Sequence, residues 1–291
     1  MRLPIHSTIQ DLLIKNLEAI ENHFEGNVFT YFGPILDGNE STILKIIEEV
    51  ALSEYKKEKL YVILTTGGGS ANAVERYVNI MRYHYNEINF IVPNYAYSAG
   101  TIFCMSGDNI LMDYSSVLGP IDPQVQNKEG KLVAALGYLD KINELLEKAR
   151  QETISQTEFL ILRDFDLAEL REYEQAKELT IALLKKWLVK YKFKNWTEHR
   201  TNPLKLGQHV TLDEKELRAI EIADKLSNNN KWKSHGRPIN IDILINDLRL
   251  EISDYSAKTI ERNLIREYND LVSDYVTTNR LPIFVQSRLF L

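Results

Sequence analysis

The sequence has a single cysteine, Cys104, among its 291 residues. One cysteine excludes an intrachain disulfide framework and a cysteine-rich zinc site, and it is the usage expected in a reducing compartment. No uninterrupted run of about 18 apolar residues occurs, so the sequence predicts no transmembrane helix. The first residues turn polar at Gln10 and Asp11 and lack the apolar stretch of a signal peptide, and we therefore expect a cytoplasmic protein.

An excess of basic residues is also missing. Lys and Arg number 35 against 41 for Asp and Glu, which gives a formal net charge of −6. A mildly acidic chain argues against general nucleic-acid binding. One stretch, 185–200, mixes basic and aromatic residues, but its aromatic residues have the spacing of a helix's core face, so its lysines are expected in solvent. The histidines show no paired ligand spacing such as HExxH, and we expect no metal site and no cofactor.

Apolar periodicity divides the chain into two halves. In the first half, short apolar strands alternate with amphipathic helices, which is the pattern of a parallel sheet covered on both faces. The expected strands are 28–32, 60–64, 88–92 and 109–112, and the expected helices are 8–24, one with Ser41 as N-cap, 71–85 and 99–105. In the second half, the periodicity predicts long helices at 137–150, 165–193 and 256–278. A capping box at Thr211 predicts the start of a further helix, which runs to Leu226.

We therefore expect an α/β fold with a mainly helical C-terminal half, organised in three segments. Residues 1–135 are predicted to form the α/β core. Residues 136–226 are predicted to be a helical extension that packs on this core. Residues 227–291 are predicted to be a polar linker, 227–238, followed by a C-terminal segment that is mainly helical.

Glycines dominate the loop that follows the strand expected at 60–64. Gly67-Gly68-Gly69 allows the backbone to approach a ligand closely with its N–H groups exposed, although a plain strand-to-helix turn explains three glycines equally well. A phosphate-binding loop is disfavoured. Ser70-Ala71 stands where a Walker loop has Lys-Ser/Thr, and the dinucleotide fingerprint lacks its last glycine.

Ser98 follows the next expected strand, lies among small residues and opens the helix expected at 99–105. At a helix start the dipole favours a developing negative charge, and the next amide can donate to an oxyanion. A serine here can also be a simple N-cap. Because the loops after parallel strands meet at one edge of a sheet, we expect the Gly67 and Gly68 amides to face Ser98. That is the arrangement of a nucleophile and its oxyanion hole.

Three segments together resemble the serine dehydrogenase proteinases, a branch of the Clp/crotonase superfamily related to signal peptide peptidase A and to the Clp proteolytic subunit. These segments are Thr65-Thr66-Gly67-Gly68, the Ala-Tyr-Ser-Ala-Gly-Thr frame around Ser98, and Leu118-Gly119-Pro120-Ile121-Asp122-Pro123-Gln124. The resemblance is good over residues 29–126 and weaker to about residue 252. One departure is Thr66, where the family usually has proline. Threonine can keep the extended conformation but makes the loop less rigid.

The resemblance implies a Clp/crotonase-like spiral of parallel strands and helices. It implies that the protein is a serine endopeptidase in which Ser98 is the acylated nucleophile and the amides of Gly68 and Ala99 hold the oxyanion. The substrate is then a polypeptide, and the expected assembly is a homo-oligomer that needs no metal or nucleotide.

The sequence leaves the general base open. Pro120 stands where the Clp proteolytic subunit has its histidine, so the Clp-type pair is absent. Lys131 lies where short archaeal relatives carry a lysine base, with Lys141 and Lys148 further along the same region. His235 matches a His-Gly-Arg-like segment of the family. Lys131 and His235 are the candidate bases, and a lysine would have to be desolvated to act as one.

Asp122 and Cys104 have structural interpretations, and two alternative functions are consistent with part of the sequence. Asp122, flanked by prolines, is interpreted as a turn residue rather than a catalytic carboxylate. Cys104 is interpreted as a small core residue.

A chain that keeps Ser98 but has lost its base would be an oligomeric scaffold or binding protein of the same fold. A crotonase-like acyl-CoA enzyme would use the two amides for a thioester oxygen, but the serine argues against this function, since such enzymes use carboxylates.

Overall fold

The computed structural model describes residues 4–126, 132–200 and 203–291. Its centre is a six-stranded sheet with the order β10-β1-β2-β3-β5-β9. The strands are β1 (Asn27–Phe32), β2 (Lys59–Thr65), β3 (Glu87–Val92), β5 (Asn109–Met112), β9 (Ser253–Asp254) and β10 (Phe284–Gln286). Neighbouring strands pair in parallel except β10, which runs antiparallel to β1. The predicted α/β fold with parallel strands is confirmed.

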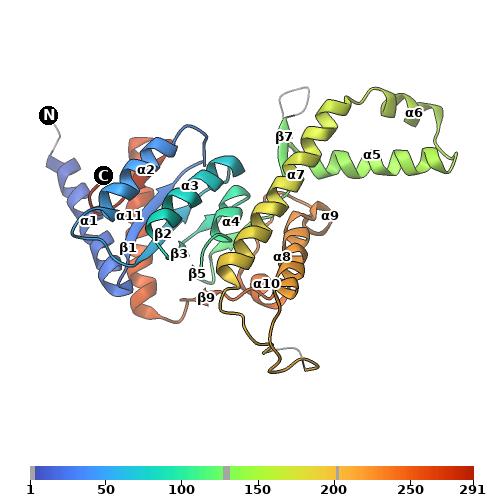
Figure 1. Cartoon of the computed structure of the whole chain (residues 1–291). Coiled ribbons are helices and arrows are strands. Elements are labelled where there is room, and N and C mark those ends of the chain that lie inside the picture. The colour runs from blue at the N-terminus through green and yellow to red at the C-terminus, as the bar shows by residue number, and fades with distance from the viewer. Residues whose placement is uncertain (1–3, 127–131, 201–202) are drawn as a thin grey trace.

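The central strands contribute to two apolar cores, because successive side chains of a strand point to opposite faces of the sheet. In β2, Leu60, Val62 and Leu64 belong to the larger core, whereas Tyr61 and Ile63 belong to the smaller one. The larger core is covered by α2 (Glu40–Ala51), α3 (Ala71–His84), α4 (Ala99–Cys104) and α7 (Leu167–Trp187). The smaller is covered by α1 (Pro4–Phe24) and α11 (Thr259–Asn279) (Figure 1).

Short strands extend the structure beyond the end of β2. β4 (Tyr95–Ala96) pairs in parallel with β6 (Val117–Leu118), and a bridge between Thr66 and Ala96 joins this pair to the loop after β2. β7 (Gln124–Gln126) pairs antiparallel with β8 (Leu132–Ala134). Strands of two or three residues are too short to show a hydrophobic period, which is why the sequence does not predict them.

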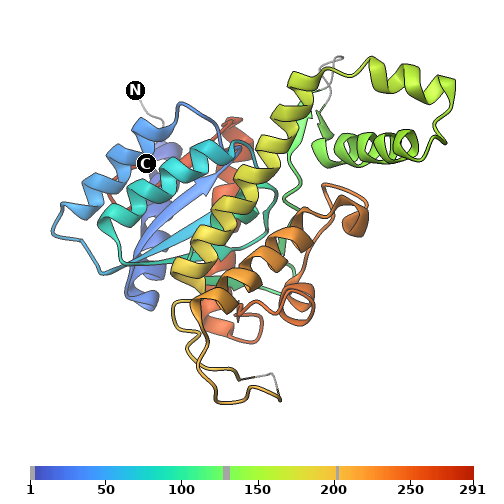
Figure 2. The same ribbon diagram turned by 45° about the vertical axis from the view of Figure 1, so that its right-hand side comes forward.

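The helical half forms a long arm and a second layer. α5 (Ala135–Arg150) and α6 (Gln156–Arg163) project from the body as a hairpin, and α7 returns from it to the sheet (Figure 2). The remaining helices are a π-helical turn (Leu188–Lys192) after α7, α8 (Leu212–Ser227), α9 (Asn229–Trp232) and α10 (Ile241–Asn246). The capping box predicted at Thr211 is confirmed. Within the described ranges, no helix has the length and apolar character needed to cross a bilayer.

Two local predictions are wrong. α2 begins at Glu40 with Asn39 as its N-cap, not after Ser41, and the buried carboxylate of Glu40 accepts the Gly38 N–H at 2.9 Å. The segment 227–238 is not simply a polar linker, because it contains α9. Trp232 at the end of α9 is buried, and its indole N–H donates to the carbonyl of Lys225 at 2.8 Å. A single aromatic residue gives no periodicity from which this packing could be predicted.

The division into three segments stays a proposal, to which the structure adds one relationship. β9, β10 and α11 all come from the segment 227–291. The two strands form the outer edges of the main sheet, and α11 packs beside α1 on one of its faces. The sheet is therefore built from residues of the first and the last segment together.

Candidate active site

Ser98 lies at the sharp turn between β4 and α4. Its φ is +52° and its ψ is −118°, a conformation that residues other than glycine rarely adopt. Such strain persists only where the surroundings impose it, often at functional sites. A serine on a strained strand-to-helix turn has the geometry of a nucleophile elbow. Ser98 occupies the N-cap position of α4, but its side chain makes no capping hydrogen bond, so the helix end does not use the hydroxyl.

Two glycines allow the turn at Ser98 to pack closely. A Cβ on Gly100 would lie 2.4 Å from Cγ2 of Thr66, and a Cβ on Gly119 would lie 2.3 Å from Cδ1 of Tyr97. Both distances are far shorter than a normal carbon contact. The loop after β2, the turn and the segment after β6 can therefore approach each other only because both side chains are absent.

Thr101 ties the turn to the segment after β6. Its hydroxyl oxygen lies 2.8 Å from the carbonyl oxygen of Ala96 and 2.9 Å from that of Gly119, and it accepts the Gly119 N–H at 3.0 Å. Thr101 is fully buried, so these hydrogen bonds are shielded from water. The only signal for this role in the sequence is the position of Thr101, three residues after Ser98 on the first turn of the expected helix.

The glycine loop after β2 lies against Ser98. A Cβ on Gly68 would be 2.8 Å from Cβ of Ser98 and 3.4 Å from the amide nitrogen of Ala99. Gly68 has a φ of +109°, and its carbonyl oxygen accepts the N–H of Ile35 at 2.9 Å. Ala99 is the first residue of α4, where an amide has no acceptor within its own helix. The backbone of Gly68 and that of Ala99 thus meet beside Ser98.

The hydroxyl of Thr66 adds a constraint that the sequence does not reveal. Its Oγ1 accepts the N–H of Gly68 at 3.1 Å. This bond closes a turn of the kind that Ser and Thr side chains form with an amide two residues ahead. It orders a loop for which the sequence predicts less rigidity than in proline-containing relatives.

The side chains of His235 and Asp122 meet near this edge of the sheet. Nδ1 of His235 lies 2.9 Å from Oδ1 of Asp122, with 1% of the Asp122 side chain and 27% of the His235 side chain exposed. The interpretation of Asp122 as a turn residue misses this contact. Within the described residues its carboxylate binds side chains, those of His235 and Gln124. If Nδ1 carries the proton toward Asp122, Nε2 is the basic nitrogen.

The segment that carries His235 is anchored beside the Ser98 turn. Leu118 in β6 and Ile239 exchange two backbone hydrogen bonds of 2.9 Å, and β6 in turn pairs with β4, which leads into Ser98. In the part of the chain that the structure describes, no hydrogen bond joins Ser98 to His235. Catalytic hydrogen bonds are often long before substrate binds.

The lysine candidates differ in position. Lys131 lies outside the described residues. Lys141 and Lys148 are on α5, where Lys141 pairs with Glu144 at 2.9 Å and Lys148 with Glu158 at 2.6 Å. The hydrogen bond to Glu158 raises the pKa of Lys148, whereas a lysine base needs a lowered pKa.

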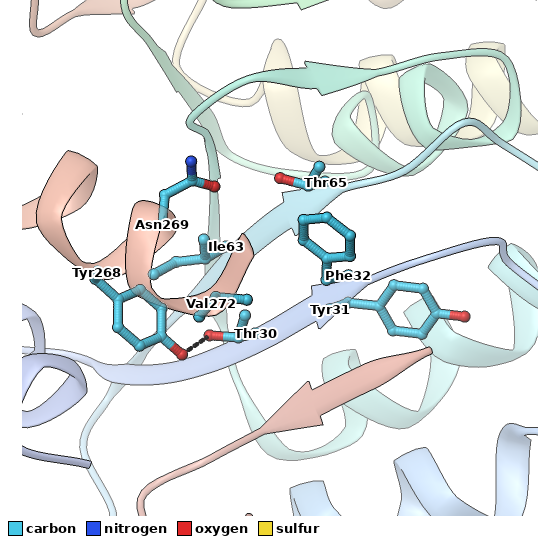
Figure 3. Close-up of a pocket in the computed structure, with 8 residues that line it drawn as sticks. All are labelled: Thr30, Tyr31, Phe32, Ile63, Thr65, Tyr268, Asn269 and Val272. Atoms are coloured by element: carbon cyan, nitrogen blue, oxygen red, sulfur yellow. Dashed lines mark hydrogen bonds between the residues drawn. The ribbon is translucent and has the colours of Figure 1, made fainter. Parts of the chain in front are cut away.

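Other chemistry-bearing groups lie apart from Ser98. Cys104 is completely buried, and burial raises the pKa of its thiol, so it is the core residue that the sequence predicts. Among the residues that the structure describes, no three His, Cys, Asp or Glu side chains gather as a metal site. Figure 3 shows a narrow pocket between α11 and strands β1 and β2. In it, the hydroxyl groups of Thr30 and Tyr268 form a hydrogen bond with 2.7 Å between their oxygen atoms. This pocket is on the sheet face opposite α4.

A mostly parallel sheet with helices on both faces and a strained serine beside a glycine loop define a class of α/β proteins with a nucleophile-elbow-like site. Comparison with known families is more specific. Residues 36–212, more than half of the chain, match the ClpP-like SDH-type serine proteinases, and the chain belongs to this family. The family expected from the three sequence motifs and its ClpP-like fold are confirmed.

Comparisons with individual proteins say less about this chain than the family match does. Two uncharacterized proteins of Methanocaldococcus jannaschii match with 39% identity over 70 residues and 32% identity over 114 residues. The matches cover 24% and 39% of this chain and 24% and 35% of the two relatives, so the chain spans about a third or less of their length. Among solved structures, a serine-to-alanine mutant of the 1510-N membrane-bound stomatin-specific protease is similar, with a TM-score of 0.46, 12% identity and coverage of 80% and 81% of the two chains.

Proposed function

We propose that the protein is a serine endopeptidase that cleaves polypeptides by acyl transfer through Ser98. The observation that carries this proposal is the strained turn that holds Ser98 against Gly68 and Ala99. Oγ of Ser98 attacks the substrate carbonyl, and the amides of Gly68 and Ala99 stabilise the oxyanion that develops. Membership of the ClpP-like SDH-type serine proteinases supports this reaction class.

We assign the general base to His235, with Lys131 as the competing candidate. Asp122 accepts the Nδ1–H of His235 and so selects the tautomer in which Nε2 is free to take the proton of Ser98. The buried carboxylate also stabilises the imidazolium that forms when the proton moves. The contact of Leu118 with Ile239 supports the assignment, because it tethers the His235 segment to the turn.

Labelling with a fluorophosphonate probe tests the proposal. The wild-type protein should form one adduct, and peptide mass spectrometry should locate it on Ser98. Ser98→Ala should abolish the adduct and casein cleavage while circular dichroism stays unchanged. His235→Ala should slow labelling, whereas Lys131→Ala should not. An adduct that survives in Ser98→Ala contradicts the nucleophile, and a folded wild-type protein that is never labelled favours the scaffold function.

The same proposal includes a cytoplasmic homo-oligomer whose subunits meet through the α5–α6 hairpin. α6 buries none of its own residues, and its large apolar side chains Phe159, Leu160 and Ile161 are 46–53% exposed. Adjacent exposed apolar residues on a projecting hairpin are typical of a contact surface. Light scattering at micromolar concentration should give a multiple of the chain mass, and Leu160→Glu should reduce it. A monomeric wild-type protein would rule out the assembly.

A further inference from the structure

The amide that would stabilise the oxyanion already has a partner inside the chain. The N–H of Gly68 donates to Oγ1 of Thr66 at 3.1 Å. An N–H group makes one strong, well-aligned hydrogen bond at a time. An oxyanion at Ser98 must therefore compete with the Thr66 hydroxyl for this donor.

Thr66 itself is held firmly. Its N–H donates to the carbonyl of Tyr95 at 3.1 Å, and its carbonyl accepts the N–H of Tyr97 at 2.9 Å. The residue is 1% exposed, and its Cγ2 fills the space above Gly100, where an added Cβ would be only 2.4 Å away. Because the methyl group occupies that space, Oγ1 is directed toward Gly68.

The peptide unit that carries the Gly68 N–H has room to turn on its Gly67 side. It lies between two glycines, and no atom is within 4 Å of the position that a Cβ on Gly67 would take. The φ of +109° at Gly68 is accessible to glycine without strain. The carbonyl of Gly68, which belongs to the next peptide unit, accepts the N–H of Ile35 at 2.9 Å and, more weakly, the hydroxyl of Thr66 at 3.5 Å. The loop can thus keep its position while one amide changes its partner.

We propose that the Thr66 hydroxyl is a latch on the oxyanion hole, a role that rests on the proposed function of Ser98. In the resting protein the latch holds the Gly68 amide, and during acylation the amide turns from Oγ1 of Thr66 to the oxyanion. A hydrogen bond to an oxyanion is roughly twice as strong as one to a neutral hydroxyl. The charged transition state therefore wins the amide more readily than the neutral substrate carbonyl does, although both states bear the cost of breaking the hydrogen bond to Thr66.

Two substitutions at one position test the latch. Thr66→Val keeps the shape of the side chain and removes the acceptor, and Thr66→Ser keeps the acceptor and removes the methyl group. The second-order rate constant for fluorophosphonate labelling of Ser98 should rise about 2- to 10-fold in Thr66→Val, the range that corresponds to one neutral hydrogen bond. Thr66→Ser should label within about 2-fold of the wild type, because its acceptor is retained. Hydrogen–deuterium exchange with residue-resolved fragmentation should show faster exchange of the Gly68 amide in Thr66→Val only.

The outcomes separate the latch from the function on which it rests. A wild-type protein without any label on Ser98 overturns the proposed function and the latch together. A labelled wild type whose Thr66→Val variant is no faster overturns the latch alone. Unchanged exchange of the Gly68 amide in Thr66→Val also overturns it, because the hydrogen bond would then be absent in solution.

Discussion

Asp122 holds the imidazole of His235 from a position 113 residues earlier in the chain, with 2.9 Å between Oδ1 and Nδ1. The carboxylate is buried and the imidazole is partly exposed, so one edge of the ring meets the carboxylate while another part of it reaches solvent. A carboxylate in this position fixes both the tautomer and the orientation of a histidine. The pair therefore has one of the two hydrogen bonds of a Ser-His-Asp triad, the one between the carboxylate and the imidazole.

Asp122→Asn should lower kcat for peptide cleavage by about 10²- to 10⁴-fold with little change in KM, because the amide favours the wrong histidine tautomer. His235→Ala should lower kcat by a similar factor. The double variant should be no slower than the slower single variant, since the two residues act as a unit. The control is His199→Ala, which removes another histidine–carboxylate pair, with Glu214 at 3.2 Å. Full activity in Asp122→Asn would make the pair purely structural.

Ser98→Gly should be more stable than Ser98→Ala by about 1 kcal/mol in urea unfolding, because glycine adopts the positive φ without strain. Neither variant should be labelled. The sign is opposite to the usual preference of a helix for alanine, and Ser273 in the middle of α11 provides the matched comparison. There Ser273→Gly should be about 1 kcal/mol less stable than Ser273→Ala. A more stable alanine at both positions would show that the turn is not strained.

Gly100→Ala should destabilise the fold by about 1–3 kcal/mol, because its methyl group would collide with Thr66. It should also slow labelling of Ser98, since the turn must move. Gly137→Ala is the control. Gly137 lies in the first turn of α5, with open space where a Cβ would be. Alanine there should raise the free energy of unfolding by about 0.5 kcal/mol and leave labelling of Ser98 unchanged. Thermal unfolding measures the stability of the two variants, and fluorophosphonate labelling measures the reactivity of Ser98. Equal shifts in melting temperature would refute the packing argument.

Lys192→Met should stabilise the protein at pH 7 by about 1–3 kcal/mol. Desolvation lowers the pKa of Lys192 to about 8 from an ordinary value of 10.5. Since the folded state binds this proton more weakly than the unfolded state, lysine costs stability below pH 8, and the cost disappears as pH rises toward 10.5. Guanidinium unfolding at pH 7 and pH 9.5 should therefore give a smaller gain at the higher pH. An equal gain at both would mean that protonation is not its cause.

The ends of the four inner strands could be predicted from the sequence to within one residue. Each strand is an apolar run, because helices cover it on both faces of the sheet. The outer strands β9 and β10 could not. Each has two or three residues, and its position depends on the edge strand that it meets rather than on a pattern of its own.

The candidate site, too, could be predicted from the sequence only in part. The proximity of Gly68 and Ser98 follows from the parallel pairing of β2 with β3, which brings the loops after both strands to one edge. The contact of His235 with Asp122 joins two loops that are distant in sequence, and neither loop carries a repeated pattern that points to the other. The hydrogen bond of Thr66 depends on a side-chain rotamer, which reflects the packing of its methyl group against Gly100 and cannot be read from the sequence.

The order in which the sheet is synthesised gives the protein a late assembly step. The four inner strands are complete by residue 112, whereas the two edge strands lie at 253–286. On the ribosome, the inner strands therefore emerge with unpaired edges and with the face beneath α11 uncovered, a state that is prone to aggregation. The residues that pack around the Ser98 turn, from Thr66 to Gly119, have all left the ribosome before the edge strands are made. Closure of the sheet by residues 253–286 is thus a separate and later step than assembly of the Ser98 turn.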